Sequence, residues 1–291
     1  MDFDQKYIKI SLFLLRQILG RTFPNPPVVA IVVESDNNKK DHKIVNFGVT
    51  AFKGRPHAEA EAIKNVKFLK NKVYTLYSTL EPCCHKGRDK PCTDFILKSK
   101  ISRVVFSLLD PDPRVNGGGM KILKNNGLDV IHGIMKDEMF EIYQGYFLNK
   151  LYQRPQIILK LATSLDGKIS SKLNTFSKIT NSTSQKYLHI LRSEVDAVLV
   201  GSNTVRIDNC LLTCRAKGLT KFSPIRVVLN KNLDIKKNYK IFKNCGKVRT
   251  IIFSKNVKEN KIKSFLKNNV EVISVDEKNY NLHFLVKYLS K

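Results

Sequence analysis

Residues 73–92 read VYTLYSTLEPCCHKGRDKPC, an apolar run rich in β-branched and aromatic residues that passes into a polar stretch with cysteine, proline and glycine. The apolar part predicts a buried strand, and the polar part predicts a loop at the end of that strand. Similar apolar runs occupy residues 28–33 and 104–109, and helical patterns occupy residues 58–69 and 94–98. Strands that alternate with helices predict an α/β layered sheet.

A second alternating series begins after the text LNKLYQRPQ at residues 148–156. Pro155 keeps the residue before it out of the helical region, so the helical pattern should break here. A chain of 291 residues can bury two separate cores. We therefore predict a first domain at residues 1–147, a linker at 148–156 and a second domain at 157–291.

The second domain also has an α/β pattern. Its expected strands cover residues 157–161, 197–200, 225–229, 250–253 and 270–273. A helix is expected between Thr183 and Arg192, with Ser182 and Gln185 as its capping pair.

The chain is strongly basic, since 51 Lys and Arg residues against 25 Asp and Glu residues give a net charge of +26. This positive charge is compatible with the binding of polyanions such as nucleic acid. The lysines are, however, spread along the chain, often beside asparagine, and form no block of consecutive basic residues. Lysine enrichment of solvated surfaces and attraction of phosphorylated small substrates both remain open. No apolar run approaches the roughly 20 residues of a membrane span. We expect a cytoplasmic protein with no specific nucleic-acid or membrane partner.

The cysteine pattern predicts a metal site rather than a disulfide framework. Cys83 and Cys92 stand close in sequence, and His57 opens a predicted helix upstream. One nitrogen and two sulfurs suit three corners of a Zn²⁺ site whose fourth corner carries water. Glu59, two residues after His57, is placed to move protons at that open corner, as hydrolytic deamination requires.

These motifs resemble those of the bifunctional riboflavin-biosynthesis deaminase/reductase family. The shared text is GRTFPNP at residues 20–26, HAE at 57–59, TLEPC with a second cysteine nine positions later, and DPDP at 110–113. Cys84 and Asp112 differ from the serine and asparagine usual in the family. The resemblance implies a cytidine-deaminase-like three-layer domain followed by a dihydrofolate-reductase-like domain. It also implies zinc-dependent deamination of 2,5-diamino-6-(5-phosphoribosylamino)pyrimidin-4-one.

The resemblance further implies which residues bind the deaminase substrate. Asn25 would present a donor and an acceptor to the pyrimidine edge, and Asp110 lies at the carboxyl end of a predicted strand. His85 and Arg88 would hold the ribose phosphate. The alternative for His85 and Arg88 is a solvated loop without a binding role.

For the second domain, the resemblance implies an NADPH-dependent reductase that opens the ribose ring to a ribityl chain. Its motifs are KLATSLDGKI at residues 160–169, GSNTV at 201–205 and LLTCR at 211–215. Matching positions implicate three cofactor-binding residues, Ala162, Thr204 and Asp208, and three substrate-binding residues, Arg192, Leu212 and Arg215. The alternative for Arg192 is a salt bridge to Glu194 or Asp196.

The family pattern continues beyond the predicted helix at residues 282–289 into a strand and a glycine-rich loop, whereas this sequence ends at Lys291. We therefore expect a C-terminal truncation that weakens binding of the NADPH pyrophosphate and impairs reduction. The resemblance also implies a homodimer. The alternative functions are a nucleic-acid or free-base zinc deaminase with a non-catalytic second domain, and a non-catalytic remnant that binds nucleotides or partners.

Overall fold

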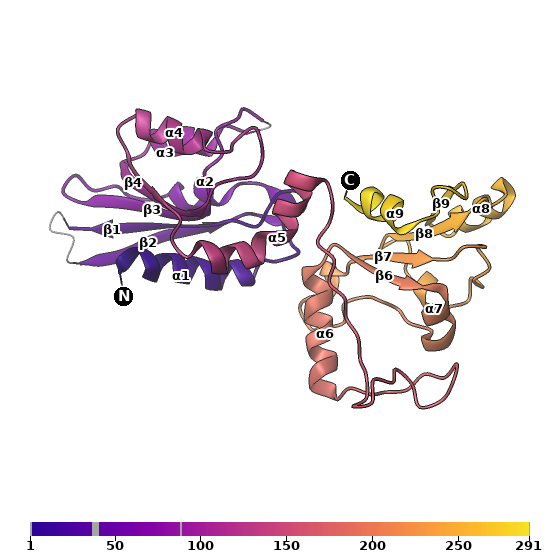
Figure 1. Cartoon of the computed structure of the whole chain (residues 1–291). Helices are drawn as coiled ribbons and strands as arrows, with labels where there is room; N and C mark the ends of the chain where they lie inside the picture. Colours follow the sequence, from indigo (N-terminus) through magenta and orange to yellow (C-terminus); the bar gives the residue numbers. More distant parts are fainter. Residues whose placement is uncertain (1, 37–40, 88, 291) are drawn as a thin grey trace. The chain divides into compact units, whose positions relative to one another are not determined.

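The computed structural model describes residues 2–36, 41–87 and 89–290. The chain divides into two compact units, Met1–Gln156 and Ile157–Leu289, and each unit contains its own sheet. Figure 1 shows the two sheets with their helices. None of the helices in the described part of the chain has the length and hydropathy that a membrane crossing requires.

The first unit is built on a five-stranded sheet with the strand order β2-β1-β3-β4-β5. Strand β1 pairs antiparallel with β2 and β3, while β3, β4 and β5 run parallel. The strands are β1 Val29–Ser35, β2 His42–Val49, β3 Val73–Leu80, β4 Ile101–Leu108 and β5 Asp129–His132. The central strands β1 and β3 are buried along almost their whole length, as their continuous apolar runs require.

Helices cover both faces of this sheet and make three layers. One face carries α1 and α5, and the other carries α2, α3 and α4 (Figure 1). The helices are α1 Phe3–Arg16, α2 Ala58–Ile63, α3 Cys92–Leu97, α4 Gly118–Asn125 and α5 Lys136–Tyr152. Their apolar faces join the sheet in one core that includes Tyr7, Leu76, Ile96 and Tyr143.

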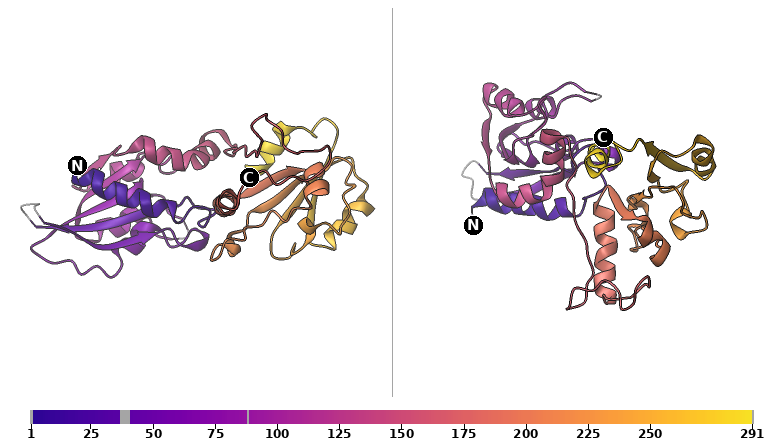
Figure 2. Two further views of the ribbon diagram at one scale, coloured as in Figure 1. Left: turned by 90° about the horizontal axis from the view of Figure 1, so that it is seen from below. Right: turned by 45° about the vertical axis from the view of Figure 1, so that its right-hand side comes forward.

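The second unit contains four parallel strands in the order β6-β7-β8-β9, which lie side by side in Figure 2. Two apolar clusters cover this sheet, one with Val205 and Phe265, the other with Leu285. The strands are β6 Ala197–Gly201, β7 Ile225–Leu229, β8 Thr250–Lys255 and β9 Val270–Val275. The helices are α6 Ser182–Glu194, α7 Ser202–Asp208, α8 Glu259–Leu266 and α9 Leu282–Leu289.

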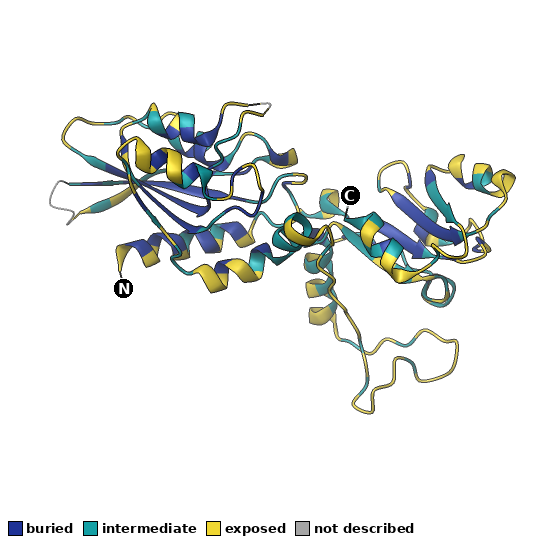
Figure 3. Cartoon of the chain, turned by 45° about the horizontal axis from the view of Figure 1, so that its top comes forward, coloured by how far each residue is buried: buried dark blue, intermediate teal, exposed yellow. Residues whose placement is uncertain are grey.

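The predicted strand at residues 157–161 is wrong. This segment is extended but pairs with none of the described strands, and it belongs to an exposed stretch that Figure 3 shows between α5 and α6. The predicted helix cap is also wrong, because Asn181 is the N-cap of α6 and accepts a hydrogen bond from the Ser184 amide at 2.9 Å. The helix α5 continues to Tyr152, so the proposed linker 148–156 begins inside a helix.

Gly48 controls how closely α2 approaches the sheet. A Cβ atom at this position would lie 2.2 Å from the carbonyl oxygen of Ala58 and 2.5 Å from the amide of Ala62. Both atoms belong to the backbone of α2, so a side chain would have to push the whole helix outward. The helix begins directly after His57 and carries Glu59, and its position therefore depends on this glycine.

We expect Gly48→Ala to destabilise the first unit by about 1–3 kcal/mol, the usual cost of overpacking. Thermal unfolding followed by circular dichroism measures the change. Gly145→Ala is the matched control, since its nearest neighbours are the flexible side-chain atoms of Gln156 at 3.4 and 3.6 Å. Equal melting temperatures for the two variants would contradict the role assigned to Gly48.

Candidate functional site

Three predicted ligand residues come together at one edge of the first sheet. The Nδ1 atom of His57 lies 3.5 Å from Cys83 Sγ and 3.4 Å from Cys92 Sγ, and all three atoms lie within 4.8 Å of one another. Tetrahedral zinc with ordinary Zn–S and Zn–N bonds separates its sulfur and nitrogen ligands by about 3.6 Å. The donor set and its spacing therefore fit a zinc ion.

The local fold explains why distant residues meet here. His57 is the N-cap residue of α2, Cys92 is the first residue of α3, and Cys83 follows the end of β3. Because the two helices pack against each other on the same face, their first residues lie close together. A strand end and two helix starts thus supply the three donors.

The two thiols differ in acidity. Hydrogen bonds from Cys92 and His57 lower the pKa of Cys83 to about 4, and the Cys92 amide lies 3.3 Å from Cys83 Sγ. The pKa of Cys92 is raised, because its thiol hydrogen-bonds to Cys83 and is buried. The amide of Cys92, at the start of α3, points at Cys83 Sγ, and Cys83 is therefore the more acidic of the two thiols.

Glu59 lies beside the metal-binding residues. One carboxylate oxygen, Oε2, accepts a hydrogen bond from Cys92 Sγ at 3.3 Å, and the side chain is 3% exposed. Burial and the negative charge of Cys83 raise the pKa of Glu59 to about 7. A carboxyl group with this pKa can both accept and donate a proton near neutral pH.

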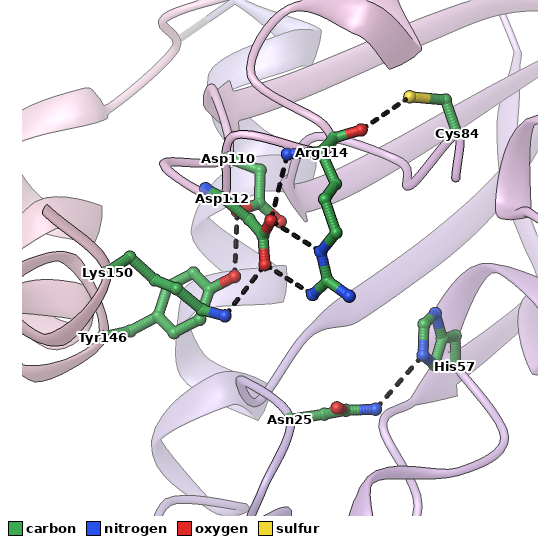
Figure 4. A network of polar contacts seen from close by, with 8 residues as sticks. All are labelled: Asn25, His57, Cys84, Asp110, Asp112, Arg114, Tyr146 and Lys150. Atoms are coloured by element: carbon green, nitrogen blue, oxygen red, sulfur yellow. Dashed lines mark hydrogen bonds and ion pairs between the residues drawn. The ribbon is translucent and has the colours of Figure 1, made fainter. Parts of the chain in front are cut away.

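Asn25 completes the surroundings of His57. Its Nδ2 atom donates a hydrogen bond to the Gly54 carbonyl at 2.8 Å and lies 3.3 Å from Nε2 of His57 (Figure 4). This contact holds the imidazole with Nδ1 toward the two thiols. His85 is half-buried, and its buried Nδ1 has no hydrogen-bond partner among the described residues. Arg88 lies outside the described residues.

Asp110 is held by several hydrogen bonds at the carboxyl end of β4. Its Oδ1 atom accepts hydrogen bonds from the Tyr146 hydroxyl and the Asp112 amide, both at 2.8 Å. Burial raises the pKa of Asp110. These contacts connect the loop after β4 to helix α5.

Glu81 is a structural residue of the site whose role the sequence analysis missed. Its carboxylate accepts hydrogen bonds from three backbone amides, those of Asp110 at 3.1 Å and of Gly117 and Met120 at 2.9 Å. The side chain is 2% exposed. Glu81 thus fastens the loop after β4 to the segment that carries Cys83. The only sequence signal was its place in Glu81-Pro82-Cys83.

The predicted reductase substrate residues lie around α6. Arg192 Nη1 donates to the Thr213 carbonyl at 3.3 Å, while its buried Nε has no hydrogen-bond partner in the described part of the chain. Burial and the nearby charge of Arg215 lower the pKa of Arg192. The Arg215 side chain is exposed. Leu212 is buried in the apolar cluster of this unit, so its side chain serves the core.

Two of the predicted NADPH residues share one helix. Thr204 and Asp208 stand one turn apart on α7, so they lie on the same helix face, and Asp208 is exposed. A hydroxyl and a carboxylate suit the ribose hydroxyls of a dinucleotide. Ala162 lies in the extended segment before α6, outside the described sheet.

The comparisons with known proteins identify the family of each unit. Residues 1–108 match the description "Cytidine and deoxycytidylate deaminase zinc-binding region", and residues 155–291 match "RibD C-terminal domain". The riboflavin biosynthesis protein RibD of Aquifex aeolicus is 39% identical over 290 residues, which cover all of this chain and 78% of that protein. The chain belongs to the RibD family. RibD of Synechocystis is 34% identical over 274 residues, or 94% of this chain and 72% of that protein.

Solved structures of the family have the same fold. Acinetobacter baumannii RibD superposes with a TM-score of 0.85 at 28% identity, covering 99% of this chain and 77% of that one. A diaminohydroxyphosphoribosylaminopyrimidine deaminase/5-amino-6-(5-phosphoribosylamino)uracil reductase from Thermotoga maritima gives 0.83 at 30% identity, with the same coverage of both chains. The cytidine-deaminase-like domain followed by a reductase domain is thereby confirmed.

Family membership establishes the activity class. The chain is a riboflavin-biosynthesis enzyme that joins a zinc-dependent deaminase, a hydrolase, to an NADPH-dependent reductase. The nucleic-acid or free-base deaminase is not favoured. The match to the Aquifex aeolicus protein runs along the whole of this chain, which spans 78% of that protein.

We expect Cys83→Ser to lower zinc affinity by more than the roughly 10–100-fold that loss of an outer-sphere partner costs, because one ligand is removed. Zinc stoichiometry by plasma mass spectrometry after dialysis measures the loss. Cys84→Ser is the control, since Cys84 is the next residue yet lies outside the three-donor cluster. Zinc loss in Cys84→Ser with zinc retained in Cys83→Ser would reverse the assignment.

Proposed function

We propose that the first unit deaminates 2,5-diamino-6-(5-phosphoribosylamino)pyrimidin-4-one at the site formed by His57, Cys83, Cys92 and Glu59. The observation that supports this proposal most directly is the fit of the three donors to tetrahedral zinc beside a buried carboxyl group. A zinc ion held by His57, Cys83 and Cys92 supplies a Lewis acid that lowers the pKa of the attacking water.

Glu59 carries the protons of this reaction. It accepts a proton from the attacking water and transfers this proton to the pyrimidine ring nitrogen. It then accepts the second proton, from the hydroxyl group now bound to the carbon, and transfers it to the amine, which leaves as ammonia while the carbonyl forms. The pKa of about 7 suits these transfers. Burial keeps bulk water away from the carboxyl group, so the proton passes between enzyme and substrate.

The substrate-binding residues surround this centre. Asn25 binds the pyrimidine edge, and His85 and Arg88 bind the ribose phosphate. Asp110 orients the substrate from the carboxyl end of β4, where ligands of α/β proteins bind. The unpartnered Nδ1 of His85 supports a role in ligand binding.

The second unit reduces the ribosyl group of the deaminated product to a ribityl chain. NADPH supplies the hydride, with Ala162, Thr204 and Asp208 lining its site. Arg192 and Arg215 bind the substrate phosphate, supported by their proximity and by the free Nε of Arg192. Leu212 contributes through its backbone, because its side chain packs in the core.

We also propose the domain limits, the location and the assembly of the enzyme. The deaminase domain covers residues 1–147 and the reductase domain residues 157–291, and the segment 148–156 that joins them includes the end of α5. The enzyme acts in the cytoplasm as a homodimer on small phosphorylated pyrimidines, without a specific nucleic-acid or membrane partner.

Glu59→Gln should abolish ammonia release, with a rate loss of at least 10²–10⁴-fold, because the amide cannot carry protons. A coupled ammonia assay with the phosphorylated pyrimidine measures the rate, and metal analysis verifies that zinc stays bound. Glu61→Gln is the matched control, since Glu61 stands two residues further along the same helix and makes an ion pair with Lys64 near the surface. Near-normal turnover by Glu59→Gln would rule out the assigned role.

For the reductase, we expect Arg192→Gln to raise the KM for the deaminated substrate by about 10–100-fold, the usual effect of losing a charge-assisted hydrogen bond. The KM for NADPH should stay within about threefold, because the guanidinium serves the phosphate of the substrate and not the cofactor. NADPH oxidation at 340 nm measures both constants. A change confined to the KM for NADPH would instead place Arg192 in the cofactor site.

A further inference from the structure

Three charged residues form a compact cluster at the edge of the deaminase site. We call Asp112, Arg114 and Lys150 the rim triad. Asp112 Oδ2 accepts hydrogen bonds from Arg114 Nη2 at 2.6 Å and from Lys150 Nζ at 2.8 Å. Asp112 Oδ1 accepts two more from Arg114, from Nε at 2.9 Å and from the backbone amide at 3.1 Å.

The rim triad is built into the wall of the zinc site. Cys84, the neighbour of Cys83, donates a hydrogen bond from its thiol to the Arg114 carbonyl at 3.6 Å. The carboxylate of Glu81 binds the amides of Asp110 and Gly117, which stand on either side of the segment with Asp112 and Arg114. The guanidinium of Arg114 points toward the side of the site where Asn25 and His57 lie (Figure 4).

Arg114 gives the rim triad its net positive charge. The Asp112 side chain is only 6% exposed and stands next to the carboxylate of Asp110. The Arg114 guanidinium and the Lys150 ammonium hold the pKa of Asp112 well below its usual range, so Asp112 is ionised at neutral pH. One carboxylate and two cations leave the rim triad with one net positive charge. Without Arg114 the triad would be neutral.

We propose that Arg114 is a positioning residue of the deaminase, which together with Lys150 outweighs the charge of Asp112, so that the rim triad presents a net positive charge to the phosphorylated substrate. This inference rests on the proposed function of the first unit. It assigns Arg114 no contact with the reacting atoms. Its effect is electrostatic attraction of a dianionic ligand into the site.

The test compares net charge at the rim across five forms of the full-length zinc enzyme, of which R114K keeps the charge of wild type. Wild type and the double variant D112N/R114Q each carry one net positive charge at the triad. R114Q carries none, and D112N carries two. The KM and kcat for ammonia release from the phosphorylated pyrimidine are measured for each form at low and at physiological ionic strength.

R114Q should raise the KM about tenfold, the order expected for one unit charge near a surface site, with kcat within about twofold. D112N/R114Q should return the KM to within about threefold of wild type, and R114K should do the same because it keeps the charge. The KM of R114Q should also depend less on salt than that of wild type. A purely structural role of Arg114 would not make the KM follow the net charge of the rim triad, and it would not lower the salt dependence of the KM.

Two results would overturn the inference: an unchanged KM in R114Q, or a double variant as weak as R114Q. Zinc content and melting temperature identify a variant that fails to fold, and D112N/R114Q and R114K then decide the question.

If wild type releases no ammonia from this pyrimidine, the proposed function fails on its own. In that case the affinity of each form for inorganic phosphate is measured in a thermal-shift titration. Weaker binding by R114Q than by wild type, D112N/R114Q and R114K supports the inference, and equal affinities reject it.

Discussion

The buried carboxylate of Glu81 organises the deaminase site. It accepts hydrogen bonds from three backbone amides of the segment after β4, while its own backbone continues into Pro82 and Cys83. An acceptor at 2% exposure is stable only because those amides replace its hydration. The parallel pairing of β3 with β4 brings the two strand ends to one edge, and Glu81 locks the loops that follow them. Gly119 fits this arrangement because a Cβ there would lie 2.1 Å from the Pro82 carbonyl.

Much of the metal centre could be predicted from the sequence because its donors mark the boundaries of secondary structure. His57 and Cys92 stand at helix starts that local residue patterns indicate, and Cys83 ends an apolar run. The position of Glu59 follows from its spacing to His57 on the same helix. Local pattern and tertiary arrangement agree at these four residues, so the sequence alone indicates that they belong to one site.

Other features depend on contacts that no local pattern contains. The rim triad joins residues 112 and 114 to Lys150 on another element, and only the packing of α5 against the sheet brings them together. The segment 157–161 has a strand-like composition, but a strand also needs a partner, and none of the described strands pairs with it. Which of the two thiols is the more acidic is also not visible in the sequence, because it depends on which sulfur the Cys92 amide faces.

The acidity of Cys83 has a chemical consequence for the apoprotein. With a pKa of about 4, this sulfur is an anion across the physiological pH range, and the anion is the form that peroxides and alkylating agents attack. Coordination ties up the lone pairs that such reagents require. The ion that the site would hold therefore also shields its own ligand from oxidants and alkylating agents.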